Sequence, residues 1–138
     1  MGTNYYLYEP ECKECGHTPE PKHIGKSSAG WCFALHVYPD DGDNSVNSLG
    51  DWKDYIKLSQ KVNGSIIKDE YERTLTLEEL LHHITERKWE GNKDRTPQFL
   101  KDNYAVEGPN GLLRHKIDGS HCIGHGEGTW NLLISDFS

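Results

Sequence analysis

The chain has 138 residues, is 34% hydrophobic and carries a formal net charge of -7 at pH 7. This length fits one domain over residues 1–138. The acidic balance argues against general binding of nucleic-acid phosphates, which needs a positive face. The longest apolar run, residues 31–35, is too short to cross a membrane. We therefore expect a soluble, cytoplasmic protein.

The first predicted element is a strand over residues 3–8, where β-branched and aromatic side chains dominate. A Cys-x-x-Cys pair, Cys12 and Cys15, follows it. Cys122 and His125 repeat this spacing near the other end of the chain, and a glycine follows each pair. Three cysteines and one histidine suit a tetrahedral, closed, structural zinc site. We therefore expect one Zn²⁺ bound by Cys12, Cys15, Cys122 and His125, which would join the N- and C-terminal segments.

The fourth zinc ligand is open among His125, His121 and His17, and the spacing favours His125. A thioredoxin-type redox pair is disfavoured, because such a pair should lie where a strand enters a helix. Pro10 and Pro19 flank this pair instead and indicate a loop. A catalytic zinc needs an open coordination position, which four protein ligands do not leave. The metal is therefore assigned to folding rather than to chemistry.

The next two predicted strands flank a stretch with several functional groups. Residues 22–26 predict a short strand, 27–30 a turn and 31–38 a central strand with two mostly apolar faces. Glycines let backbone amides approach a ligand, serines donate hydrogen bonds and lysine supplies charge, so such a turn can bind an anion. The candidate ligand-binding residues here are His23, Gly25, Lys26, Ser27, Ser28 and Trp31.

An ordinary hairpin turn with a solvated lysine is the alternative interpretation of this stretch. The phosphate loop of nucleotide hydrolases is excluded, because that motif needs a glycine where Glu20 stands. Cys32, at the start of the following strand, is expected to be a buried core thiol.

Two helices are predicted in the middle of the chain. Ser48 precedes a helical stripe of apolar residues that ends before Gly64. Thr76 and Glu79 form a capping box, which starts the second helix.

Three further strands are predicted at residues 65–68, 112–117 and 129–137. The acidic residues that follow the first of these, beginning with Asp69, are expected to form an exposed edge. Arg114 and His115 lie on the second and would add positive charge if it runs beside the candidate ligand site. The zinc would bring the last strand near the first, and we expect these two to pair. The prediction is a small α+β domain with a mostly antiparallel sheet and about two helices.

Several segments of the chain resemble known sequences: residues 3–6, the Cys-x-x-Cys-Gly pair, residues 108–115 and the C-terminal residues from Gly128. The most specific segment is the run His-Ile-Gly-Lys-Ser-Ser-Ala-Gly-Trp at residues 23–31. In these segments the chain resembles a family of small uncharacterised proteins encoded by bacteriophages and prophages. The resemblance implies a setting inside a bacterial host cell. Small phage proteins of this kind often disable a host factor or sequester a signalling molecule of host defence. It implies no catalytic residues.

Three functions are consistent with the sequence. The first is a zinc-stabilised module that binds a nucleotide or another phosphate-like anion, with Arg114 and His115 completing the site. The second is an inhibitor of a host enzyme that uses an acidic surface with four tryptophans and seven tyrosines in the chain. The third is a small phosphodiesterase or nuclease in which His23, His36 or His115 acts as acid or base. This third function ranks last, because no nucleophile motif is visible.

Overall fold

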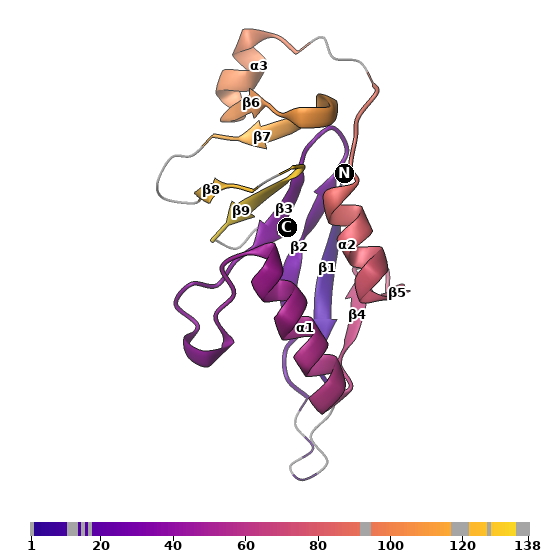
Figure 1. Ribbon diagram of the computed structural model, residues 1–138. Coiled ribbons are helices and arrows are strands. Elements are labelled where there is room, and N and C mark those ends of the chain that lie inside the picture. The colour runs from indigo at the N-terminus through magenta and orange to yellow at the C-terminus, as the bar shows by residue number, and fades with distance from the viewer. Residues whose placement is uncertain are drawn as a thin grey trace.

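The computed structural model describes residues 2–10, 14, 16, 18–91, 95–116, 122–126 and 128–134. Within these residues a seven-stranded sheet runs in the order β5-β4-β1-β2-β3-β9-β8 (Figure 1). Its strands are β1 (Gly2–Tyr8), β2 (Lys22–Ser28), β3 (Phe33–His36), β4 (Ile66–Asp69), β5 (Thr74–Leu75), β8 (Cys122–His125) and β9 (Trp130–Leu133). A separate hairpin consists of β6 (Ala105–Glu107) and β7 (Leu113–His115). All neighbouring strands pair antiparallel except β3 and β9, so the expected mostly antiparallel α+β fold is confirmed.

The helices begin and end where local sequence signals place them. In α1 (Leu49–Asn63) the Ser48 side chain accepts a hydrogen bond from the Asp51 amide, and Gly64 ends the helix in the left-handed conformation at φ 70°. In α2 (Leu77–Thr85) both hydrogen bonds of the predicted capping box are present. A third helix, α3 (Pro97–Asp102), was not predicted. Two 3₁₀ turns complete the inventory, η1 (Gly42–Asn44) and η2 (Pro109–Gly111).

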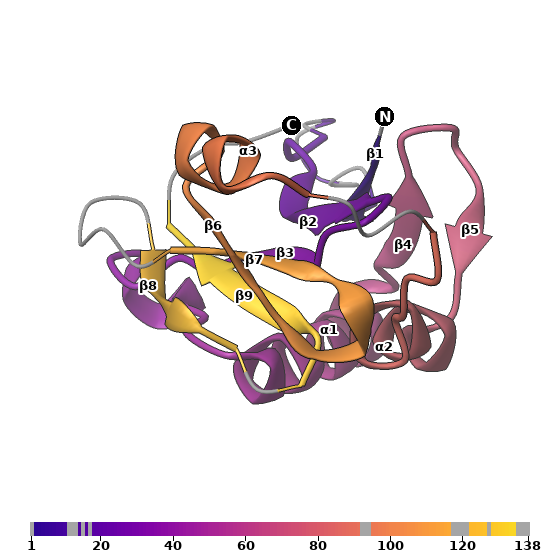
Figure 2. The ribbon, with the colours of Figure 1, turned by 90° about the horizontal axis from the view of Figure 1, so that it is seen from above.

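Helices α1 and α2 lie together on one side of the sheet, and α3 lies on the other (Figure 2). No helix in the described part of the chain combines the length and the apolar character needed to span a membrane.

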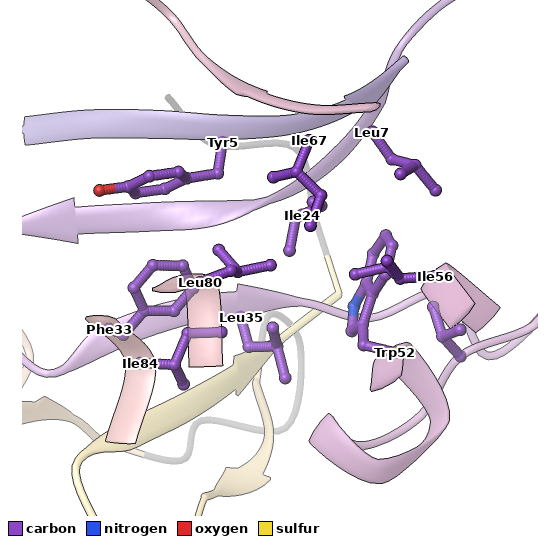
Figure 3. Close-up of a cluster of buried hydrophobic side chains, with 11 residues drawn as sticks. Tyr5, Leu7, Ile24, Phe33, Leu35, Trp52, Ile56, Ile67, Leu80 and Ile84 are labelled. Atoms are coloured by element: carbon purple, nitrogen blue, oxygen red, sulfur yellow. The ribbon is translucent and has the colours of Figure 1, made fainter. Parts of the chain in front are cut away.

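The core lies between the sheet and the two long helices (Figure 3). Alternate residues of β1 and β3 point into it, while Trp52 and Ile56 enter from α1 and Leu80 and Ile84 from α2. Full burial of one such side chain stabilises the fold by about 1.5–3 kcal/mol. All four residues of β3 are buried, which confirms the expected central strand. We call the opposite side of the sheet, where Asn4, Ala34 and Asn131 lie, the outer face.

The expected pairing of the last strand with the first is wrong. β9 runs parallel to β3 and antiparallel to β8, while β1 is flanked by β2 and β4. Both edges of β1 are therefore already hydrogen-bonded, and no edge remains for β9. The expected turn at residues 27–30 is also too long, because β2 continues through Ser28.

The acidic edge expected after residue 68 is not exposed at its first residue. Asp69 is only 3% exposed. Its carboxylate accepts hydrogen bonds from the backbone amides of Tyr71 and Arg73 and pairs with the Arg73 guanidinium at 2.7 Å. Asp69 is therefore a structural residue of the β4–β5 turn, whereas Glu70 and Glu72 are exposed as expected.

Candidate functional site

A hollow of about 260 Å³ brings together four of the eight predicted ligand-binding residues. It is lined by Lys26, Ser28, Trp31, Cys32, Ala34, His115 and Leu133. We call it the Lys26 hollow. Three of its residues, Ala34, Cys32 and Leu133, are buried and form an apolar floor.

Lys26 and Ser28 reach the hollow because they occupy alternate positions of β2, opposite Asn4 and Gly2 of β1. Both side chains lean over Gly2. A Cβ atom added at Gly2 would lie 2.4 Å from Lys26 Cε and 2.7 Å from Ser28 Oγ. No acidic residue in the described ranges forms an ion pair with Lys26. The hollow therefore holds a positive charge that no carboxylate of the described chain neutralises.

The aromatic wall of the hollow comes from two distant parts of the chain. The rings of Trp31 and His115 stack with centroids 4.9 Å apart and an interplanar angle of 22°. β7 is held beside Trp31, because the Leu113 amide donates to Gly30 O at 3.0 Å and the Cys32 amide donates to Leu113 O at 2.9 Å. Burial lowers the pKa of His115, and the nearby charge of His125 lowers it further. His115 is therefore neutral at pH 7.

The other predicted ligand residues lie elsewhere. Ser27 accepts a hydrogen bond from Arg87, which follows α2. Gly25 is buried, and a Cβ atom there would lie 2.4 Å from the Phe33 ring. Arg114 donates to the carbonyl oxygens of Gly126 and Gly128, the latter at 2.7 Å, so its charge supports the β8–β9 turn. Because residues 22–28 form a paired strand, this stretch presents side chains to a ligand rather than a nest of backbone amides.

A group of buried polar atoms lies next to the Lys26 hollow. Asn131 is 1% exposed, and neither end of its amide has a hydrogen-bond partner in the described structure. It pairs in register with Ala34 on one side and His125 on the other. His125 Nε2 and Arg114 Nε are also buried there without a partner. Buried polar groups are nearly always hydrogen-bonded, so this group is unusual.

Cys32 is a buried thiol, as expected from the sequence. Burial raises its pKa, and the guanidinium of Arg114 opposes this shift only in part. The thiol is therefore protonated and inert at neutral pH.

The predicted zinc ligands divide into two groups. Cys12 and Cys15, with the alternatives His17 and His121, lie outside the described residues. Cys122 and His125 lie on β8, where an irregularity between Cys122 and Gly124 places them opposite Leu133 and Asn131. These two partners are two positions apart on β9, so Cys122 and His125 share the outer face. In the described ranges, no three His, Cys, Asp or Glu side chains gather as a metal site would require.

A second polar cluster on the outer face was missed from the sequence. His23 Nε2 lies 2.8 Å from Asn4 Oδ1, and His23 Nδ1 lies 2.9 Å from His36 Nδ1. Tyr38 donates its hydroxyl hydrogen to His23 O at 2.8 Å. The register of a hairpin that turns at residues 29–30 places residues 23 and 36 on adjacent strands, and this was the signal in the sequence.

Comparison with known proteins finds no significant match to a family model, to a curated protein or to a solved structure. Only the geometry of the described residues therefore bears on the function of this protein.

Proposed function

We propose that the protein is a binding module for a small anion that carries a planar ring, such as a nucleotide, and that the ligand binds in the Lys26 hollow. The observation that carries this proposal is the Lys26 ammonium group, which lies without an acidic partner among the described residues beside a stacked aromatic wall. Lys26 would pair with the anionic group, and the Ser28 hydroxyl would donate a hydrogen bond to it.

The ring of the ligand would stack on Trp31, since indole faces bind planar rings and bases of any sequence. The volume of about 260 Å³ lies just below the range of about 300–1,000 Å³ that is typical of small-molecule sites. The hollow would therefore hold one part of a nucleotide-sized ligand, with the rest over its rim. In the phage setting that the sequence resembles, such a module would sequester a host signalling molecule.

The test is calorimetric titration of the full chain with a panel of mono-, di- and cyclic nucleotides. We expect Lys26→Ala to weaken binding about 10-fold or more, since hydrogen bonds to charged groups contribute about 1.5–3 kcal/mol. Lys57→Ala is the matched control, because Lys57 is exposed on α1 and far from the hollow in the fold. Equal affinities of Lys26→Ala and the wild type would refute the proposal. Recovery of unchanged nucleotide would distinguish binding from hydrolysis.

The second candidate function is inhibition of a partner protein, and one observation favours it. Leu58 and Val62 are 62% and 68% exposed and lie one turn apart on α1, where they line a shallow hollow with Tyr55. Exposed apolar residues grouped in this way are typical of interaction surfaces. A partner that the wild type and Lys26→Ala retain, but that the double variant Leu58→Lys/Val62→Lys loses, would support this function. Retention of the partner by the wild type and both variants would show that Leu58 and Val62 do not bind it.

We also propose that one structural Zn²⁺ is bound, starting from the Cys12–Cys15 pair. Cys122 and His125, the remaining ligands predicted from the sequence, share one face of β8. Their position on β8 is, however, far from the end of β1, which precedes the cysteine pair in the chain. β8 is four strand positions from β1, or about 19 Å at the usual spacing of about 4.8 Å. The chain that leaves β1 would have to extend across β2, β3 and β9 to reach them.

A further inference from the structure

Two histidine ring nitrogens face each other on the outer face. The Nδ1 atoms of His23, on β2, and His36, on β3, lie 2.9 Å apart. His36 is only 2% exposed. We propose that His23 and His36 bind one divalent transition-metal ion, zinc in the cell, through these two Nδ1 atoms. The proposal does not depend on the Lys26 hollow.

The hydrogen bonds of His23 prepare its Nδ1 as a ligand. An amide oxygen only accepts hydrogen bonds, so the 2.8 Å contact with Asn4 Oδ1 places the ring hydrogen on Nε2 and a lone pair on Nδ1. The orientation of Asn4 is set by Glu70, whose Oε1 accepts from the Asn4 backbone amide at 2.8 Å and faces Asn4 Nδ2 at 3.4 Å. Metal-binding histidines usually donate their second ring N–H to such an oxygen.

The distance between the two nitrogens is close to that of a metal site. Two histidine nitrogens at about 2.0–2.1 Å from a tetrahedral ion are about 3.3 Å apart. The observed 2.9 Å needs to widen by only a few tenths of an ångström. Without a metal, the short contact requires one hydrogen, which His36 donates to His23. The ion would take the place of this hydrogen, and His36, as a neutral ligand, would then carry its ring hydrogen on Nε2.

The surroundings hold both rings in place. The ring of Tyr38 stacks on the ring of His36 with the two centroids 4.1 Å apart. The ring of Tyr6 packs beside that of His23 with the centroids 5.3 Å apart. The indole N–H of Trp52 donates to His36 O at 2.6 Å. His23 and Tyr38 also line an open hollow of about 410 Å³, so the pair borders solvent on the His23 side. Both rings are therefore held by their neighbours close to an open hollow.

The sheet order separates this histidine pair from Cys122 and His125. Tyr6 of β1 pairs directly with His23, and His36 is one strand further. Cys122 is four strand positions away. Zinc binds four nitrogen and sulfur ligands. Two coordination positions therefore remain beyond those of His23 and His36.

The test is zinc titration of the full, metal-stripped chain against a competing chelator, with stoichiometry from native mass spectrometry. We expect one zinc per wild-type chain and more than about 100-fold weaker binding for His23→Gln. Asn4→Ala, which removes the orienting oxygen, should weaken binding about 10–100-fold. The controls Cys122→Ser, His125→Gln and the exposed His82→Gln should bind as the wild type does.

Because His36 is buried, the His36→Gln variant could fail to fold. Its zinc affinity is compared with that of the wild type only if the two circular dichroism spectra match, and otherwise the zinc affinity of His23→Gln decides the test. Wild-type zinc affinity in His23→Gln, or no zinc in the wild-type chain, would overturn the proposal. Loss of zinc only in Cys122→Ser and His125→Gln would overturn it in favour of the ligand set predicted from the sequence. Nucleotide titration of the same variants separates this result from the role of Lys26.

Discussion

At the scale of single residues, Asn131 is the clearest departure from what a stable core needs. Its amide is 1% exposed, and neither polar end has a partner in the described structure. Leaving a buried polar group unsatisfied costs about 1–3 kcal/mol. Natural proteins keep such costs mainly at functional sites. The position of Asn131 beside Ala34, which lines the Lys26 hollow, is consistent with that pattern.

We therefore expect Asn131→Leu to raise the free energy of unfolding by about 1–3 kcal/mol, because an apolar side chain of similar size removes the unsatisfied amide. Urea denaturation of the two proteins measures the difference. Asn131→Asp is the opposite control, since a buried carboxylate should lower stability. A Leu variant less stable than the wild type would show that the amide makes hydrogen bonds that matter to folding.

At the scale of elements, the β6–β7 hairpin is the structure that completes the Lys26 hollow. It is attached through two backbone hydrogen bonds to the segment before β3 and through the stack of His115 on Trp31. The two short strands of the hairpin form a small sheet of their own, and a single bridge between Leu113 and Trp31 links it to the rest of the fold. Its attachment should therefore be more sensitive to solution conditions than the central sheet.

The pKa of His115 makes this attachment dependent on pH. Burial and the charge of His125 hold the pKa below its ordinary value of 6.5. As the pH falls below 6.5, the unfolded chain binds a proton that the folded chain resists, so stability decreases. We expect His115→Gln to flatten the fall of the thermal midpoint between about pH 6.5 and 5. Identical pH profiles for the two proteins would contradict a half-buried, neutral His115, and exposed His82→Gln is the control.

At the scale of the whole molecule, the proposed anion site lies in an acidic chain. The formal net charge of -7 repels anions at long range, whereas Lys26 attracts them at contact. We therefore expect the protein to select a small anion that fits the hollow rather than to bind polyanions in general. The fold also separates its candidate sites: the Lys26 hollow lies near the β2–β3 turn, and the His23–His36 pair lies toward the other end of these strands.

The sequence by itself determined the elements whose signals are local. The Ser48 cap, the Gly64 stop and the Thr76–Glu79 box set the bounds of α1 and α2, because capping involves residues within four positions of each other. The mostly apolar faces of residues 31–38 identified the central strand for a similar reason, since burial on both faces of a strand shows within one segment, although β3 itself covers only Phe33–His36. The sequence grouped Lys26, Ser28 and Trp31, which line one hollow, because these residues lie close together in the chain.

Only the tertiary structure decided which distant residues meet. The sequence placed the last strand beside the first, yet β9 pairs with β3, since both edges of β1 are already occupied. It grouped His23 with Lys26, although the pleat and the irregularity in β2 direct His23 toward His36 and Asn4. The stack of His115 on Trp31 depends on where β7 docks. Such contacts join positions far apart in the chain, and side-chain periodicity within one segment carries no information about them.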